Sequence, residues 1–293
     1  MSLLLEKGAQ ANRPDLLDFQ PLIEALEIGD IETVQLLLSA GAEVKSERDS
    51  HYTALHAILY YENGPESLDQ ENILQLVELL LEAGVDINSS LREDSKTHNT
   101  YYGMTALEMA VCGGFLDIIK LLLSRGAEMT DATLFFATRS GTTQVVHFLL
   151  DAGANVNGKA KCGNTALKEA VRAKNVQMVE ILLSRGAIVN DLYQGRGMTP
   201  LQEACYIGHV GLAKTLLEAG AVVNAAAGEH DPWFDSYIGF RGTALQAAAH
   251  RGSAELVSVL LNAGADPNAP VPEYGEAILV AAARKKDMCL VTL

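Results

Sequence analysis

Histidines and clustered acids are the side chains of this chain that could carry out acid–base or metal chemistry, and their spacing argues against both. No two of the seven histidines have the i, i+4 spacing of a helical metal site. The one small acid–base cluster, His230 with Asp231 and Asp235, sits beside the only tryptophan and is more typical of turn chemistry than of catalysis. A Gly-rich phosphate loop and a Gly-x-Ser-x-Gly elbow are both missing from the sequence. We therefore expect no catalytic site, no cofactor and no metal ion.

The cysteines predict free thiols. Cys112, Cys162, Cys205 and Cys289 lie 50, 43 and 84 residues apart, which matches neither a zinc site nor a small disulfide framework. Free thiols are typical of a reducing compartment, so we expect a protein of the cytoplasm or nucleus. Apolar runs are far shorter than the roughly 20 residues of a membrane span, and we expect no membrane partner.

The charge is strongly negative and unevenly distributed. The net charge is −15; residues 1–100 hold 19 acids and 6 bases, whereas residues 101–293 hold 18 acids and 16 bases. Nucleic-acid binding needs a basic footprint to neutralise phosphates. The composition therefore excludes nucleic acid as the expected partner.

The elements that must position these side chains are repeats. Phrases such as LLLSAGA at 36–42 and LLLSRGA at 121–127 occur eight times, and they close on Gly8, Gly41, Gly84, Gly126, Gly153, Gly186, Gly220 and Gly264. Self-similarity with steps of 27 to 44 residues predicts a stacked-repeat protein. Because stacked repeats present an extended surface rather than a deep pocket, we expect a binding protein before an enzyme.

The clearest unit runs from Lys161 to Asn190. Thr165 can cap a first helix that carries apolar residues at helical spacing. A second helix follows, with Val176, Val179, Leu182 and Leu183 on one stripe, and closes at Gly186, the residue favoured where a helix ends in a left-handed turn. The polar residues 188–197 then turn the chain back toward the next unit.

The stretch GMTPLQEACYIGHVGLAKTLLEAGAVVN at 197–224 resembles the ankyrin repeat, with its Gly-x-Thr-Pro-Leu-His, Gly-His and Leu-Leu-x-x-Gly-Ala-x-x-Asn pattern. The resemblance covers nearly the whole chain. It implies an all-α solenoid of about eight units in a single domain, 1–293, with a partial unit at 276–293. The motif histidine survives only as His56, so we expect the other units to lose one side-chain hydrogen bond. Both ends are cut inside a unit, and we expect a fragment of a longer array or ends that dock on something.

Three insertions break the repeat, at residues 60–72, 89–102 and 225–240. Doubling a loop costs only about 0.6 kcal/mol, so each could be neutral. The third, at 225–240, favours a function because it contains Trp233 with Phe234, Tyr237 and Phe240, and aromatic residues are frequent at interfaces. A small aromatic cluster packed on the neighbouring hairpin is the alternative.

The resemblance implies a binding face on the concave side, where the ends of the first helices lie. Arginine and tyrosine, which are typical interface anchors, recur at these positions. With the loop tryptophan, the candidate contact residues are Tyr60, Tyr61, Arg139, Arg172, Tyr206, Trp233, His250 and Arg251. The arginines favour an acidic segment in the C-terminal half of the groove. They could instead be solvated or paired with acids such as Glu169, Glu203 and Asp235.

Together these features predict a non-enzymatic scaffold that binds a protein or peptide along its groove. The alternative is an enzyme or small-molecule binder with a site formed by the groove and the 225–240 loop, for which His230, His250, Arg251 and Tyr206 are the candidates. A structural spacer within a longer chain is a third possibility.

Overall fold

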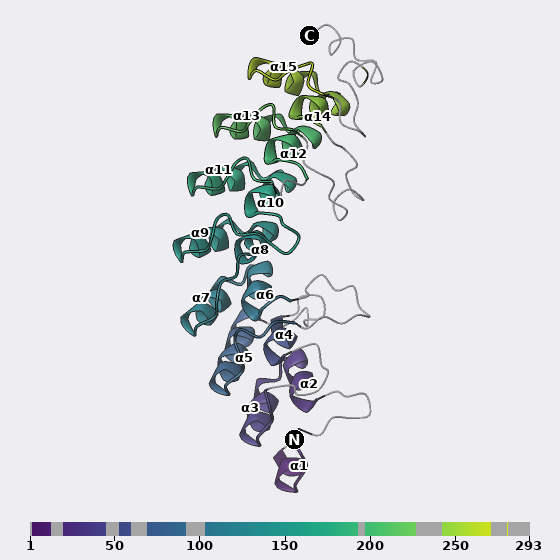
Figure 1. The fold of residues 1–293 in the computed structure, drawn as a ribbon. Helices are drawn as coiled ribbons and strands as arrows, with labels where there is room; N and C mark the ends of the chain where they lie inside the picture. The colour runs from purple at the N-terminus through teal and green to yellow at the C-terminus, as the bar shows by residue number, and fades with distance from the viewer. Residues whose placement is uncertain are drawn as a thin grey trace. The chain divides into compact units, whose positions relative to one another are not determined.

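Short α-helices make up the computed structural model of the protein (Figure 1). It describes residues 2–12, 20–44, 53–59, 69–91, 103–192, 197–226 and 242–270, together with residue 280. Among these described residues there is no β-strand, and the extended pairings are isolated antiparallel bridges, Ser90 with Thr105 and Lys159 with Thr165. The predicted all-α fold is confirmed, while the number of repeats stays a prediction.

The chain divides into two compact units, residues 1–133 and 134–293. The expected single domain therefore stays a prediction, and each unit is described by itself. In the first unit, three helix pairs follow α1 (Ser2–Glu6): α2 (Pro21–Ile28) with α3 (Ile31–Ser39), α4 (Ala54–Leu59) with α5 (Gln70–Glu82), and α6 (Ala106–Cys112) with α7 (Leu116–Ser124). First helices pack on first helices and second helices on second helices.

The second unit has the same organisation. Its helices are α8 (Thr133–Ser140), α9 (Thr143–Asp151), α10 (Ala166–Arg172), α11 (Val176–Ser184), α12 (Pro200–Tyr206), α13 (Val210–Glu218), α14 (Ala244–Arg251) and α15 (Ala254–Asn262). First helices α10, α12 and α14 pack in succession, as do second helices α11, α13 and α15.

Threonine fixes the start of the first helices. The Thr165 hydroxyl accepts a hydrogen bond from the backbone N–H of Lys168, as the sequence predicted. At Thr105, Thr199 and Thr243 the side chain three residues later also bonds back to the threonine N–H, which forms a capping box. These bonds satisfy N–H groups that have no partner inside the helix, so each helix begins at a defined residue.

Glycine ends the second helices. At Gly186, with φ of 87°, the glycine N–H binds the Leu183 carbonyl and the next N–H, of Ala187, binds the Leu182 carbonyl at 3.0 Å. This is the left-handed ending that glycine adopts without a Cβ penalty. All eight closing glycines of the repeated phrase have positive φ, which confirms the predicted helix ends.

The repeated phrase also supplies the core. Its middle leucine is completely buried in most copies, as at Leu80, Leu122, Leu149, Leu182, Leu216 and Leu260. Burying one leucine side chain stabilises the fold by about 1.5–3 kcal/mol. Because most copies contribute one leucine at the same depth, the core is a continuous row within each unit rather than one centre.

The side chain at the third position of the first helices bridges to the next repeat. His56 Nε2 lies 3.0 Å from the Met104 carbonyl oxygen. Where the motif histidine is replaced by Gln202, the amide nitrogen donates to the carbonyls of Ala225, Ala226 and Gly242 at 3.0–3.1 Å. The expected loss of this hydrogen bond is therefore wrong at Gln202, because the glutamine amide reaches the same kind of backbone acceptor.

An asparagine side chain links the turns that follow the second helices of neighbouring repeats. Asn190 donates to the Gly220 carbonyl at 3.1 Å and accepts from the Val222 N–H at 2.8 Å. The same two-bond bridge is made by Asn12, Asn88, Asn157 and Asn224. Thr130 stands at this position in another repeat, and its hydroxyl binds Glu108 instead. The final Asn of the repeat pattern is thus a connection between neighbouring units of the stack.

The first insertion is partly helical. Residues Gln70 to Asn72, expected in the break between two helices, form the first turn of α5, with Asp69 at the N-cap position. In the second insertion, Leu91 is buried and its N–H binds the Met104 carbonyl at 3.0 Å. Residues 60–68 of the first insertion, 92–102 of the second and 227–240 of the third lie outside the described residues.

Candidate partner-binding surface

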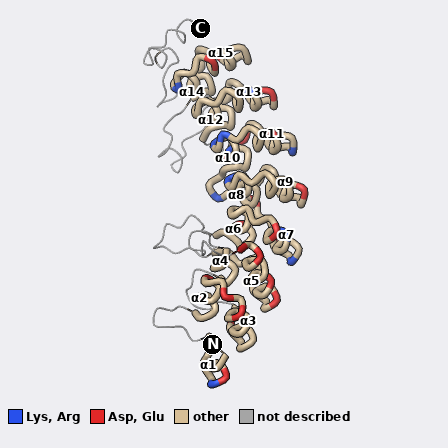
Figure 2. The backbone as a smooth tube through the Cα atoms, turned by 180° about the vertical axis from the view of Figure 1, so that it is seen from behind, with Lys and Arg blue, Asp and Glu red and all other residues tan. Residues whose placement is uncertain are grey.

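The candidate contact residues of the second unit lie in the last turns of its first helices. Arg139 is in α8, Arg172 in α10, Tyr206 in α12, and His250 with Arg251 in α14. Arg139, His250 and Arg251 are exposed, and Arg172 and Tyr206 are half-buried. Figure 2 shows basic residues on α8 and α10, while acidic residues are frequent on α2, α3 and α5 of the first unit.

Two contacts join the ends of α12 and α14. The rings of Tyr206 and His250 are nearly parallel, at 9°, with centroids 6.3 Å apart. Next to them, the Arg251 side chain lies over Gly208: a Cβ added to that glycine would be 3.1 Å from Nε and 3.2 Å from Cγ of the arginine. Gly208, in the Gly-His part of the repeat, therefore leaves the room in which Arg251 lies flat.

A chain of alternating charges connects the other arginines. Arg172 forms an ion pair with Glu203, whose side chain is only 1% exposed. Burial raises the pKa of Glu169, and the opposing charges of Arg172 and Arg139 act to lower it. Arg139, Glu169, Arg172 and Glu203 thus alternate in sign from α8 through α10 to α12.

The chain of charges continues on the other side of Glu203. Lys168 is buried, and burial lowers the pKa of its ammonium group, although the charges of Glu203 and Asp191 oppose this shift. Asp191 in turn pairs with Lys159 at 2.8 Å. One buried carboxylate oxygen each of Asp191 and Glu203 has no hydrogen-bond partner among the described residues, while the other oxygen is paired with Lys159 or Arg172.

The comparison with known families decides what these repeats are. Residues 25–133 and 134–227 match the family described as "Ankyrin repeats (3 copies)", and residues 242–270 match "Ankyrin repeat". The chain belongs to the ankyrin repeat family. Ankyrin repeats are generally protein–protein interaction modules.

Several curated proteins are similar to parts of this chain. "Dynein axonemal heavy chain 12" of Bos taurus is 29% identical over 64% of this chain and 60% of its own length. "Ankyrin repeat and KH domain-containing protein mask-1" of Caenorhabditis elegans is 30% identical over 64% of this chain and 8% of its own length. "B-cell lymphoma 3 protein homolog" of Mus musculus is 32% identical over 53% of this chain and 33% of its own length. The matched region is less than two thirds of each relative.

Within the ankyrin repeats, the paired interpretation fits two of the arginines, whereas binding of an acidic segment by the arginines stays a prediction. Arg172 pairs with Glu203 and Arg139 influences Glu169, as the paired alternative expected. Arg251 instead lies over Gly208, beside the Tyr206 and His250 rings. The structure thus brings Tyr206, His250 and Arg251 together, while Arg139 and Arg172 belong to the charge chain.

Other predicted residues lie outside the described part of the chain. These are Tyr60, Tyr61 and Trp233 of the contact set, and His230, Asp231 and Asp235 of the loop cluster. Lys159, Lys168 and Asp191 were missed by the sequence analysis. A lysine where the ankyrin pattern has histidine was the available signal for Lys168, but the acids that accompany it come from other repeats.

No group of three or more His, Cys, Asp or Glu side chains among the described residues could hold a metal ion. None of the helices in the described ranges is long and apolar enough to cross a membrane. Burial raises the pKa of the Cys205 thiol to about 12, so this thiol stays protonated in the core.

Proposed function

We propose that the chain binds a protein partner through the ends of the first helices in its second unit. The observation that carries this proposal is the group formed by Tyr206, His250 and Arg251, in which two stacked rings lie beside an arginine held flat on Gly208. The stacked Tyr206 and His250 rings restrict each other's rotamers, so ordering this pair when a partner binds costs less side-chain entropy. Tyrosine and arginine are also the residues most often found at interface hot spots.

An acidic segment is the partner that fits this surface best. Arg251 and Arg139 are exposed, and an arginine guanidinium binds a carboxylate through two parallel hydrogen bonds. Arg172 contributes less, because Glu203 already neutralises much of its charge. A protein segment is preferred to nucleic acid because the net charge of −15 repels a long phosphate backbone.

We propose further that this binding takes place inside the cell, as the cysteine usage suggests. The partner, rather than the repeat protein, would then decide the biological pathway. The alternative site for a small molecule or an enzymatic reaction depended on the 225–240 loop, most of which lies outside the described residues. The described residues supply no observation that favours it.

The test is a quantitative pull-down with matched variants. Arg139→Ala combined with Arg251→Ala removes two exposed cations from this surface. Arg185→Ala combined with Lys214→Ala removes two cations from the second helices α11 and α13 of the same unit, which keeps the net charge of the two variants equal. We expect at least one protein to be retained by the wild type and the control variant and lost from the first variant.

The same experiment can overturn the proposal. If every protein captured by the wild type is captured equally by both variants, with circular dichroism unchanged, the ends of the first helices are not the contact surface. Losing the same proteins from both variants would instead show that total charge, rather than this surface, governs binding. Adding Tyr206→Ala to the comparison tests the ring pair separately from charge.

A further inference from the structure

The second helix α5 of the first unit is one turn longer than its neighbour. It has 13 residues, whereas α7 has 9. The buried Leu80 of α5 and Leu122 of α7 are equivalent positions of the repeat, so the helices are in register at their C-terminal ends. The extra residues, Gln70 to Ile73, therefore extend α5 at its N-terminal end by about one turn, roughly 5.4 Å. By this register, the positions equivalent to them precede α7, which begins at Leu116.

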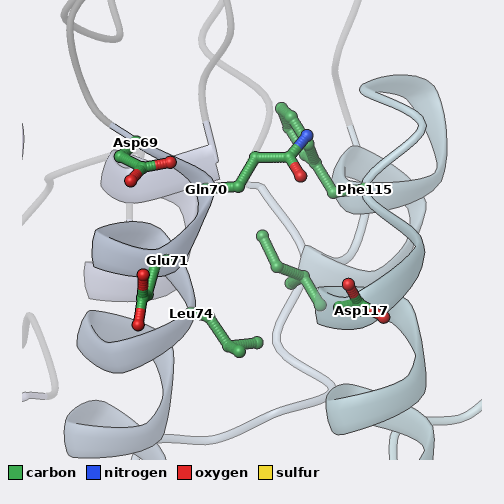
Figure 3. A pocket seen from close by; sticks show the side chains of 7 residues that line it. Asp69, Gln70, Glu71, Leu74, Phe115 and Asp117 are labelled. Atoms are coloured by element: carbon green, nitrogen blue, oxygen red, sulfur yellow. The ribbon is translucent and has the colours of Figure 1, made fainter.

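A cavity of about 350 Å³ lies between the first turns of α5 and α7 (Figure 3). Leu74 of α5 points toward α7, and with Phe115 and Ile118 it forms an apolar wall. Asp69 and Glu71 line the α5 side and Asp117 the α7 side. The cavity thus combines an apolar surface with three carboxylates, and its volume is at the lower end of that of ligand pockets.

The Phe115 ring is held in place by Gly113. A Cβ on Gly113 would lie 2.3 Å from Cε2 of Phe115, far closer than two carbon atoms can approach. The ring therefore occupies space that only a glycine leaves open. Its position at the N-cap of α7, where a side-chain oxygen is usual, leaves the ring available to line the cavity.

The rim of the cavity is negative. Lys120 pairs with Asp117 at 3.0 Å and neutralises one of the three carboxylates. The positive ends of the α5 and α7 dipoles amount to about half a charge each, which offsets roughly one more. Asp69 and Glu71 are both exposed, and the Asp69 carboxylate makes no capping hydrogen bond to its own helix. Among the described residues, these positive charges leave about one carboxylate charge at the rim that is not offset, and this charge is available to a cation.

We propose that this cavity binds an arginine or lysine side chain from a basic segment of a partner protein. The aliphatic stem lies along Leu74 and Ile118. The charged group is held at the rim between Phe115 and the first turn of α5, where Gln70 points toward Phe115 and Asp69 and Glu71 supply the negative charge (Figure 3). Long cationic side chains bury their methylene groups in this way while the head group stays at a polar rim. The face of an aromatic ring also attracts a cation, by about 0.5–1 kcal/mol at an exposed site.

The chain's own neighbouring segment is a poor occupant. Residues 60–68, which come directly before Asp69, contain Glu62 and Glu66 and no lysine or arginine. Their charge has the same sign as that of the cavity rim, which disfavours these residues as its occupant. The proposal is independent of the partner surface in the second unit, because it concerns a different kind of partner and residues of the first unit only.

The experiment uses a defined probe and the full chain. A fluorescein-labelled peptide with two arginines in a Gly-Ser background is titrated against the protein. The same peptide with citrulline in place of arginine is the uncharged control. Asp69→Asn combined with Glu71→Gln removes two carboxylates of the cavity. Glu78→Gln combined with Glu82→Gln removes two exposed carboxylates of the same helix outside it.

We expect the cavity variant to bind the arginine peptide at least fivefold more weakly than the wild type, and the control variant to stay within twofold. The peptide should shift the methyl resonances of Leu74 and Ile118, and the citrulline peptide should not. Equally weakened binding of the arginine peptide in both variants, or unchanged methyl resonances, would overturn the proposal. Either result would show that the peptide is attracted only by the general negative charge of the protein. A fivefold gain on deleting residues 60–68 would also overturn it, because that segment would then be the occupant.

Discussion

The guanidinium of Arg172, at the end of α10, is paired with the carboxylate of Glu203, which lies inside α12 of the next repeat and is 1% exposed. Lys168, also buried, faces the same carboxylate from the first turn of α10. Two cations of one repeat therefore hold one buried acid of the following repeat. Burial of a charge is costly unless it is compensated, so this group fixes how the two first helices pack.

Removing Arg172 should destabilise the fold, because the buried charge of Glu203 then loses its ion-pair partner. We expect Arg172→Met to lower the free energy of unfolding by about 2 kcal/mol, less than the 3–5 kcal/mol typical of a fully buried pair, because the arginine is 26% exposed and Lys168 remains. Urea denaturation followed by circular dichroism measures the change. The matched control is Arg185→Met, which breaks an exposed pair with Asp151 and should cost less than about 0.5 kcal/mol. Similar losses in both variants would contradict the role assigned to Glu203.

The asparagine bridge predicts a second stability effect. Asn190→Ala removes two hydrogen bonds to the following turn, at Gly220 and Val222, and should cost about 1–2 kcal/mol. Thermal unfolding by calorimetry gives the difference. Asn262→Ala, an exposed asparagine at the end of α15, should leave stability unchanged or slightly raised because alanine favours the helix. A neutral Asn190→Ala would mean that water replaces the bridge at no cost.

The buried His56 predicts a pH dependence of stability. Burial lowers its pKa from the ordinary value of 6.5, and the hydrogen bond to the Met104 carbonyl only partly opposes this. The unfolded chain therefore binds a proton near pH 6.5 that the folded chain does not bind. The free energy of unfolding consequently falls as the pH decreases below 6.5. The slope is about 1.4 kcal/mol per pH unit until the lowered pKa of the folded state is reached.

The control for this pH effect is His56→Gln, because Gln202 occupies the same position in its repeat and donates to the Gly242 carbonyl, which precedes the next N-cap threonine as Met104 does. We expect unfolding free energies at pH 7.5 and 5.5 to differ more in the wild type than in the variant, by up to about 1.4 kcal/mol. Parallel pH profiles for the two proteins would show that His56 does not titrate as the structure indicates.

Much of the fold could be predicted because it depends on local rules. Thr165 caps its helix, Leu182 is buried and Gly186 has positive φ, each as the pattern of one repeat requires. The expected hydrogen-bond loss at Gln202 was wrong for a non-local reason, since its acceptors lie 23 to 40 residues further along the chain. The start of α5 was also missed, because residues 60–72 were assigned to an insertion although the helix already begins at Gln70.

The candidate sites were less accessible to sequence reasoning. The common register of the repeats placed Tyr206 and His250 at equivalent positions, and their stacking follows from it. The partners of Lys168, and the cavity over Phe115, depend on which side chains of different repeats meet. A repeat pattern specifies positions but not the charge or size of the neighbour at each position.

The sequence by itself determined the ankyrin repeat, the starts and ends of most helices and the leucines of the core, because these depend on side chains within about one repeat length. Only the tertiary structure decided that Arg172 is paired with Glu203, that Arg251 lies flat on Gly208, and that an extra turn of α5 opens a cavity beside Phe115. Those features arise from contacts between repeats, where stacking brings together side chains that the spacing within one repeat does not relate.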